Sequence, residues 1–440
     1  MRKLLLFKFR SSLYNTQTLP PLKRKTMIIC IASLIAILSL TVLIVTLKSK
    51  LPEISPPILY YQLVEGTIYP EADALPGTRS VGFGSCVDVS SRGDFVVLGG
   101  MEDDEYYVGA VWVHNFTDFT VKLTGGSSPA EQRLLGSSCS VSDSSQQKKI
   151  LAVGARGEDS NRGKVYIFED LLVDSEYFIR PNDSTSAGSA FGTSVSISGD
   201  GLTIAASAPG ADTGVGRVFI YDRIASEDWN LTGELRPSAE DHPQSFGNTV
   251  HLSSDGLRLA SSVHTRNTTM GGVEVFNRPD RLSEFTRSQV IQPPDSEDQK
   301  VGQYFSMSRD GLRLFLPSSV SGEEELGMVW VYEYSAADRK FMLDKALGPL
   351  NTTSIHYTST TYNGDRFLTC SDGNNGCQLR TVYDKWAVVQ TITPDVIPLD
   401  DVTLHKVTRS AFSDDGKKLV LSSISFNSTE SGAWFFSSPL

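Results

Sequence analysis

The sequence predicts an all-β protein, a seven-bladed β-propeller of four-stranded blades that follows one N-terminal transmembrane helix. Two observations predict this fold. A pattern of turns and alternating apolar residues recurs seven times, at spacings between 52 and 56 residues. One long apolar segment without any charge precedes the first copy. Repeats of this length with four strands each are typical of propellers, in which every copy forms one blade.

The first element is the N-terminal segment. Residues 1–50 carry nine Lys and Arg and no acid, while residues 27–47 carry no charge at all. A helix of this length, at about 1.5 Å per residue, spans roughly the 30 Å of a bilayer core. Seven of the bases precede it, which predicts a cytoplasmic tail over 1–26, a signal-anchor helix over 27–47 and a stalk over 48–59. A cleaved signal peptide fits less well, because the apolar run is long and no small-x-small site follows. We therefore expect a type II membrane protein whose remaining residues are extracellular or lumenal.

The repeat is clearest in residues 191–221, which contain three alternating apolar runs separated by turns. Alternation with Val, Ile and aromatic residues predicts strands, and Ser-Gly-Asp-Gly predicts a tight hairpin. Further apolar runs that end in Pro lie between copies and predict a fourth strand, as in 231–237. The copies begin at positions 84, 136, 192, 247, 302, 355 and 407.

The ends of the repeat region predict how the ring closes. Residues 60–69 alternate like the fourth strands and are followed by Pro, although no copy precedes them. The last copy ends near 434–436 without a fourth strand. We therefore expect 60–69 to form the outermost strand of the last blade, so that the propeller comprises 60–440.

Three features of the copy at 191–221 resemble the FG-GAP repeat of integrin α-subunit N-terminal domains: Phe191-Gly192, Ala208-Pro209 and the closing aromatic strand. The resemblance covers about residues 58–440 and implies a seven-bladed propeller, usually a binding platform in adhesion proteins. The family's Asp-x-Asp-x-Asp-Gly calcium loop is reduced to one carboxylate, as in 198–201 and 308–311. Calcium takes six to eight oxygen ligands, so we expect no calcium or other cofactor, and aspartates that cap the turns.

The cysteines and sequons agree with an exported domain. Cys370 and Cys377 flank a turn-rich hexapeptide and predict a disulfide in an oxidising compartment. Cys86 and Cys139 stand at neighbouring positions of successive copies, where either a disulfide or two buried thiols fits. Acceptor sites predict a glycoprotein and occur at Asn115, Asn182, Asn230, Asn267, Asn351 and Asn427.

The sequence contains none of the common catalytic or metal-binding motifs, so we expect no enzyme. Residues 51–440 have a net charge of −20, which argues against a nucleic acid partner. The tripeptide Arg92-Gly93-Asp94 stands where other copies turn, and we interpret it as a turn. The matched middle positions of the innermost strands would line a central channel and are mostly small: Asp88, Ser140, Ser196, His251, Ser306, Ser359 and Ala411.

These features predict a non-catalytic surface protein that presents a propeller for adhesion or for recognition of a protein or glycan. The alternatives are a lumenal type II enzyme acting on glycans and a structural subunit of a membrane complex. Four of the sequons fall on the loop side of blades three to seven, whereas blades one and two carry acids there. Either a binding surface for a basic partner or a solvated acidic loop fits these residues: Glu102, Asp103, Asp104, Glu105, Tyr106, Tyr107, Glu158 and Asp159. The short, proline-containing stalk places the membrane near the opposite side.

Overall fold

The chain divides into two units, residues 1–58 and 59–440, and all described residues belong to the second. A computed structural model describes residues 62–68, 81–102, 108–115, 120–124, 132–142, 149–170, 176–181, 186–223, 228–238, 243–265, 271–294, 300–302, 304–319, 327–348, 355–371, 376–392, 407–423 and 432–438. The predicted tail, anchor helix and stalk lie outside these residues. Within these ranges no helix has the length and apolar character needed to cross a membrane.

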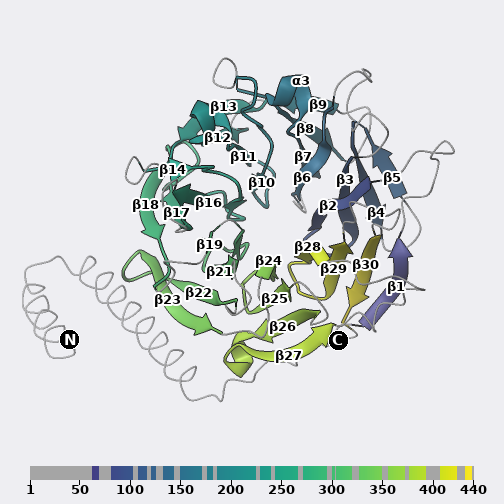
Figure 1. Ribbon diagram of the computed structural model, residues 1–440, viewed down its shortest axis with the longest axis vertical. Coiled ribbons are helices and arrows are strands. Elements are labelled where there is room, and N and C mark those ends of the chain that lie inside the picture. Colours follow the sequence, from purple (N-terminus) through teal and green to yellow (C-terminus); the bar gives the residue numbers. More distant parts are fainter. Residues whose placement is uncertain are drawn as a thin grey trace, which may run out of the picture. The chain divides into compact units, whose positions relative to one another are not determined.

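The second unit is a seven-bladed β-propeller, as the sequence predicted (Figure 1). Blades 1 to 3 consist of β2 (Val81–Val89), β3 (Phe95–Glu102), β4 (Ala110–Asn115), β5 (Thr120–Leu123); β6 (Leu135–Val141), β7 (Ile150–Ala155), β8 (Lys164–Glu169), β9 (Glu176–Ile179); and β10 (Val195–Ile197), β11 (Thr203–Ala208), β12 (Arg217–Asp222), β13 (Asn230–Leu235). Short helical turns occur at α3 (Glu158–Asn161), α4 (Ala211–Gly214) and η3 (Val382–Asp384).

In blades 4 and 5 the innermost strand is split into two short pieces that both pair with the second strand. Blades 4 to 7 consist of β14 (Pro243–Gln244), β15 (Val250–Leu252), β16 (Arg258–Thr265), β17 (Gly271–Asn277), β18 (Thr286–Ile291); β19 (Lys300–Val301), β20 (Ser306–Met307), β21 (Arg313–Ser319), β22 (Val329–Ser335), β23 (Lys340–Leu347); β24 (Ile355–Thr360), β25 (Arg366–Ser371), β26 (Cys377–Thr381), β27 (Ala387–Ile392); and β28 (Val407–Phe412), β29 (Lys418–Ser423), β30 (Gly432–Ser437), β1 (Gln62–Ile68).

The two ends of the propeller meet in blade 7. Strand β1 pairs antiparallel with β30, with Gln62 opposite Ser437 and Ile68 opposite Ala433. Figure 1 shows β1, in purple, beside the yellow strands of the C-terminus. The predicted closure of the ring by residues 60–69 is confirmed for the described residues 62–68.

We name the two sides of the ring by their connections. The hairpin face carries the connections between the first and second strands and between the third and fourth strands of each blade. The loop face carries the connections between the second and third strands and from one blade to the next. Because β1 is antiparallel to β30, the chain enters β1 from the hairpin face.

The hydrophobic core lies between successive blades. One cluster joins Ala206 and Phe219 of blade 3 to Ile150 and Ile167 of blade 2, and Phe191 meets Phe219 edge to face at 5.7 Å. Both sheet faces are covered, so β7 and β11 are buried at every position. This burial explains why their sequences, ILAVGA and TIAASA, are apolar or small throughout rather than alternating.

The glycine that opens most copies is required by backbone geometry. Gly192 has φ +86°, and a Cβ there would lie 2.6 Å from the carbonyl oxygen of Lys164. Only glycine adopts this conformation without strain and allows such close approach. The same left-handed conformation occurs at the matched Gly84, Gly136, Gly247 and Gly302.

The aspartates of the first hairpins cap their turns, as predicted. Ser198 Oγ donates to Asp200 Oδ1 at 2.7 Å, the N–H of Leu202 donates to the same oxygen at 3.1 Å, and Ser198 Oγ accepts from the N–H of Thr203. The same Ser–Asp bond recurs in three more blades, at Ser253–Asp255, Ser308–Asp310 and Ser413–Asp415. Among the described residues no group of three or more His, Cys, Asp and Glu could hold a metal ion.

The tripeptide at 92–94 is also a turn, since the N–H of Gly93 donates to the carbonyl of Ser90 at 2.8 Å. Both pairs of cysteines in the propeller form disulfides. Cys370 and Cys377 are directly opposite on β25 and β26, which confirms the predicted bridge. Cys86 and Cys139 are bonded too, with Cα atoms 5.7 Å apart, and this bridge joins blade 1 to blade 2.

Candidate functional site

The innermost strands enclose a central channel with a cavity of ≈ 270 Å³. All seven matched positions anticipated from the sequence line it, from Asp88 in blade 1 to Ala411 in blade 7. Among the described residues the lining is rich in Ser and Thr, with Asp88 as the one carboxylate and Arg309 and Arg409 as the guanidinium groups. The sequence therefore placed these residues together correctly.

Their polar groups connect one blade to the next. Asp88 Oδ2 accepts from the N–H of Val141 at 2.9 Å, and Ser140 Oγ accepts from the N–H of Ile197 at 3.2 Å. Ser196 Oγ repeats this step with blade 4, accepting from Leu252 at 3.0 Å. Hydroxyl pairs link blade 5 to blade 6 and blade 6 to blade 7: Ser306 with Thr358 at 2.9 Å, and Ser359 with Ser410 at 2.6 Å. The channel hydroxyls are thus structural links.

Asp88 and His251 are the two titratable residues at the matched channel positions, and both are bound by neighbouring groups of the propeller. Burial raises the pKa of Asp88, whereas Arg309 and the N–H groups of Val141 and Val89 oppose the rise. Burial lowers the pKa of His251 to about 4, so its ring is neutral near pH 7. His251 Nε2 lies 3.0 Å from the carbonyl oxygen of Phe305 and donates to it in this neutral state. Both groups therefore support the wall of the channel.

Arg309 crosses the hairpin end of the channel, and sequence reasoning missed it. The residue belongs to the first hairpin of blade 5, yet its Nη2 donates to the carbonyl of Val141 in blade 2 at 2.9 Å. Its Nη1 lies 3.2 Å from Asp414 Oδ1 in blade 7, and Asp88 of blade 1 is 3.9 Å away. One feature of the sequence could have identified Arg309: it is the one basic residue at its hairpin position among the seven copies.

First hairpins of neighbouring blades are bonded to one another at four junctions near Arg309. Backbone bonds join neighbours: Gly199 N–H to Ser254 O at 2.9 Å, Ser254 N–H to Arg309 O at 2.6 Å, Asp310 N–H to Tyr362 O at 3.0 Å and Asp414 N–H to Ser91 O at 2.9 Å. At the loop end the lining includes Asn248, Tyr304 and Arg409, whose guanidinium lies 6.0 Å from the Tyr304 ring centroid. The two ends of the channel therefore differ in chemistry.

The acidic surface expected on blades 1 and 2 is only partly described, and one member must be corrected. Glu158 is 5% exposed; its Oε1 lies 2.5 Å from Lys164 Nζ, and its Oε2 accepts from the Tyr166 hydroxyl at 2.7 Å. It is compensated inside its own blade and offers no charge to a partner. Asp159 pairs with Arg180, whose hydrogen bond lowers the pKa of this carboxyl. Glu102 ends β3, and residues 103–107 lie outside the described residues.

Two loop-face turns share an unusual backbone. Within α3, Asp159 and Ser160 have φ values of 51° and 60°, and within α4, Asp212 and Thr213 have values of 53° and 58°. Non-glycine residues rarely adopt this left-handed conformation, which persists only where surrounding contacts hold it. The contacts include Gly157 N–H to Arg133 O at 3.0 Å and Gly210 N–H to Ser189 O at 3.1 Å. These turns are therefore fixed before any partner arrives.

Two of the six sequons fall on described residues. Asn230 is exposed at the start of β13, whereas Asn115 is half-buried at the end of β4. The other four, Asn182, Asn267, Asn351 and Asn427, lie outside the described residues.

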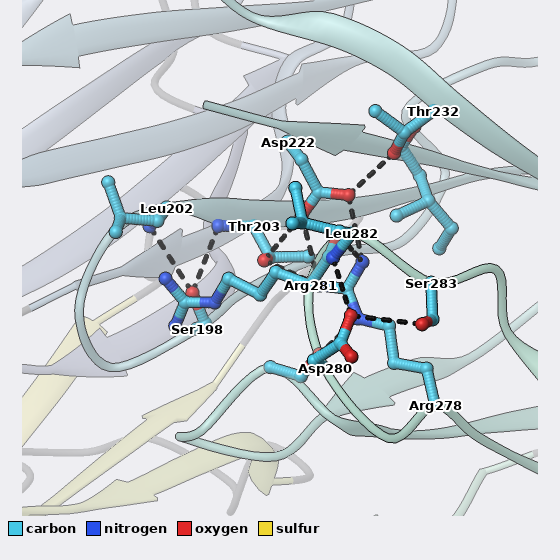
Figure 2. A network of polar contacts seen from close by, with 12 residues as sticks. Ser198, Leu202, Thr203, Asp222, Thr232, Arg278, Asp280, Arg281, Leu282 and Ser283 are labelled. Atoms are coloured by element: carbon cyan, nitrogen blue, oxygen red, sulfur yellow. Dashed lines mark hydrogen bonds and ion pairs between the residues drawn. The ribbon is translucent and has the colours of Figure 1, made fainter. Parts of the chain in front are cut away.

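A buried charge cluster lies between blades 3 and 4 (Figure 2). Arg278 follows β17 and forms a two-pronged ion pair with Asp222 at the end of β12, with Nη1 to Oδ2 at 2.8 Å and Nη2 to Oδ1 at 2.9 Å. Thr203 Oγ1 and Thr232 Oγ1 also donate to Asp222, at 2.7 Å and 2.5 Å. Both charged side chains are 1% exposed. Every group in this cluster has a partner within it, which makes it a contact between blades.

Comparison with known proteins supports the fold. No protein-family model matches the sequence, and no curated protein matches it. The β-propeller domain of Myceliophteria thermophila Cps50 (Swd1) is 12% identical, with a TM-score of 0.55 over 85% of this chain and 99% of that chain. Kuenenia stuttgartiensis hydrazine synthase is 13% identical, with a TM-score of 0.54 over 83% of this chain and 98% of that chain. Similarity at this level of identity shows the propeller fold alone.

Proposed function

We propose that this protein is a non-catalytic recognition protein that displays its propeller outside the cytoplasm and binds a protein or glycan through the loop face of blades 1 and 2. The observation that carries the proposal is the pre-formed loop-face turn α3 of blade 2, whose backbone conformation recurs at α4 in blade 3. A surface that is already ordered loses less conformational entropy on binding. The channel, by contrast, uses its hydroxyls between blades.

The acidic segment 102–107 is the second part of this surface. It adds four carboxylates and two tyrosines to the loop that follows β3. Tyrosine is enriched at interfaces, and a cluster of one charge accelerates encounter with an oppositely charged partner. With Glu158 removed from the surface, residues 102–107 become the main source of its charge. A basic protein, or a glycan carrying a cationic group, fits this surface.

Two observations support the proposed location. The uncharged segment 27–47 has the length of a bilayer core. Two disulfides join residues of the propeller, and such bonds persist in oxidising compartments. The resemblance to the FG-GAP repeat supports an adhesive role, since integrin-type propellers serve as binding platforms.

A two-step experiment tests the proposal. Full-length protein in lipid nanodiscs is first applied to protein and glycan arrays to identify a ligand. The triple variant Asp103→Lys, Asp104→Lys, Glu105→Lys is then compared with the wild type by surface plasmon resonance across a salt series. Slower association and a weaker salt dependence are expected, because the steering charge has been reversed.

The matched control is the double variant Glu284→Lys, Asp384→Lys, which reverses two exposed acids on the hairpin face. It should leave association unchanged. Unchanged binding by the triple variant, with its thermal unfolding intact, would exclude residues 103–105 from the binding surface.

A further inference from the structure

We infer that the hairpin face of blades 4 to 6 rests on the lipid surface of the membrane that holds the anchor. This inference depends on the anchor in the proposed function and adds an orientation and a second interaction surface. It assigns the loop face to the partner and the hairpin face to lipid. Three features support it: exposed apolar side chains, their continuity across blades, and the side from which the chain enters.

Large apolar and aromatic side chains project from the hairpin face. Leu282 is 78% exposed, Leu312 43%, Tyr383 40% and Tyr362 38%. Leu282 and Tyr383 belong to connections between third and fourth strands, and Leu312 and Tyr362 belong to first hairpins. The other large exposed hydrophobic residues in the described ranges lie on outer strands: Phe178, Leu231, Val290, Met342, Leu343 and Val388. A gathering of such residues on one face marks an interaction site.

These side chains belong to one continuous surface. Hydrogen bonds join their connections within and between blades. Arg258 Nη1 to Gly311 O links blades 4 and 5, and Arg313 Nη1 to Asn363 O at 2.9 Å links blades 5 and 6. Arg281 Nη2 to Asp255 O at 3.3 Å lies within blade 4, and Tyr383 OH to Asp365 Oδ2 at 3.2 Å lies within blade 6. The loops that carry the four exposed residues are therefore connected across blades 4 to 6. Connected loops lose less conformational freedom when they meet a flat surface.

The chain approaches the propeller from this same face. Strand β1 begins at Gln62 opposite Ser437, and the next residue, Ser438, donates its N–H to the carbonyl of Lys417 in the first hairpin of blade 7. Fourteen residues, 48–61, separate the apolar segment from β1. Even fully extended they span at most about 50 Å. The hairpin face is therefore the side of the propeller that the chain enters after the apolar segment.

The charges on this face indicate which lipid property matters. Exposed bases alternate with exposed acids along its loops, as in Asp338-Arg339-Lys340 and Asp384-Lys385. A mixed surface has no strong attraction to anionic lipid, so the leucines and tyrosines supply the contact. Tyrosine favours the interfacial region of a bilayer, where its ring is apolar and its hydroxyl is hydrated. A neutral phosphatidylcholine surface should therefore suffice.

Lipid-quenched fluorescence on the full chain tests the inference. Cys30→Ser removes the free thiol of the apolar segment, and Leu282→Cys or Leu312→Cys then carries an NBD label. The matched control is Val290→Cys, which is 46% exposed near the loop-face end of β18 in blade 4. In phosphatidylcholine nanodiscs with spin-labelled lipid, labels at 282 and 312 should be blue-shifted and quenched, and the label at 290 should be neither. High salt should not change this difference.

The outcomes separate the inference from the proposed function. Incorporation that resists alkaline carbonate, with equally weak quenching at 282, 312 and 290, overturns the lipid contact and leaves the anchor standing. Failure of the chain to float with the bilayer removes the anchor, and the inference with it. A blue shift that grows with protein concentration, without lipid quenching, assigns the patch to a second copy of this chain and also overturns the inference.

Discussion

The contact between blades 1 and 2 and the contact between blades 3 and 4 hold equivalent neighbours by different chemistry. The first is covalent, through Cys86 on β2 and Cys139 on β6. The second is ionic, through Asp222 and Arg278, in a site almost closed to solvent. One repeated backbone geometry therefore accepts either a covalent or an ionic contact between neighbouring blades. We therefore expect a reductant to weaken the contact between blades 1 and 2, and acid to weaken the contact between blades 3 and 4.

The ionic contact is itself repeated. Glu169 ends the third strand of blade 2 and pairs with Arg223, which follows the third strand of blade 3, at 2.6 Å. Asp222 and Arg278 occupy the same two positions one blade further on. The acid at the end of a third strand and the arginine one position after the next third strand are therefore a matched pair. This rule connects residues about 55 positions apart.

Removing one partner of the buried pair should have the largest effect. Asp222→Ala leaves the Arg278 guanidinium buried without its countercharge, a change that costs about 3–5 kcal/mol in comparable pairs. Differential scanning calorimetry should show a clear drop in the unfolding temperature. Asp212→Ala is the control, because Asp212 pairs with Arg217 near the surface, where such pairs contribute at most about 1 kcal/mol. Equal drops for both variants would contradict the special role of the buried pair.

Breaking the covalent contact should come next. The double variant Cys86→Ser, Cys139→Ser removes a bridge across 53 residues and should lose about 2–4 kcal/mol. Cys370→Ser with Cys377→Ser is the control, since that bridge spans only 7 residues and constrains the unfolded chain less. A reductant should reproduce the first loss in the wild type. If the short bridge mattered more than the long one, chain constraint would not be the mechanism.

Acid should produce the smallest effect and separate the two contacts. Burial opposes ionisation of Asp222, but hydrogen bonds from Arg278, Thr232 and Thr203 hold the pKa of this carboxyl below its usual range. The ionised carboxylate therefore stabilises the fold fully above about pH 4, where the unfolded residue titrates, and this stabilisation is lost as pH falls through the folded pKa. The difference in free energy of unfolding between wild type and Asp222→Asn should therefore narrow as pH falls through this folded pKa. The corresponding difference for the Cys86→Ser, Cys139→Ser variant should stay constant. A parallel narrowing in both variants would refute the assignment of the acid effect to Asp222.

Local sequence patterns were sufficient to predict the blades, because the apolar pattern of each strand follows from the burial of that strand. Alternating and fully apolar runs mark the strands, and the turn residues at 198–201 mark a hairpin that the structure contains. The strand at 60–69 was recognised by its similarity to other outer strands. The prediction that Glu158 belongs to the acidic surface was wrong, because Lys164 and Tyr166 bind its carboxylate inside the blade. The sequence of acidic residues does not show that these two side chains lie beside it.

The sequence by itself determined the repeat, the number of blades, the closure of the ring and the Cys370–Cys377 bridge, because each depends on local periodicity or on residues close in the chain. The tertiary structure decided which polar groups face one another across blades. Arg309 reaches Val141, and Arg278 reaches Asp222, over 168 and 56 positions. It also decided between a bridge and two thiols at Cys86 and Cys139. Such contacts depend on the angle and register between neighbouring sheets, which form only once the whole ring has closed.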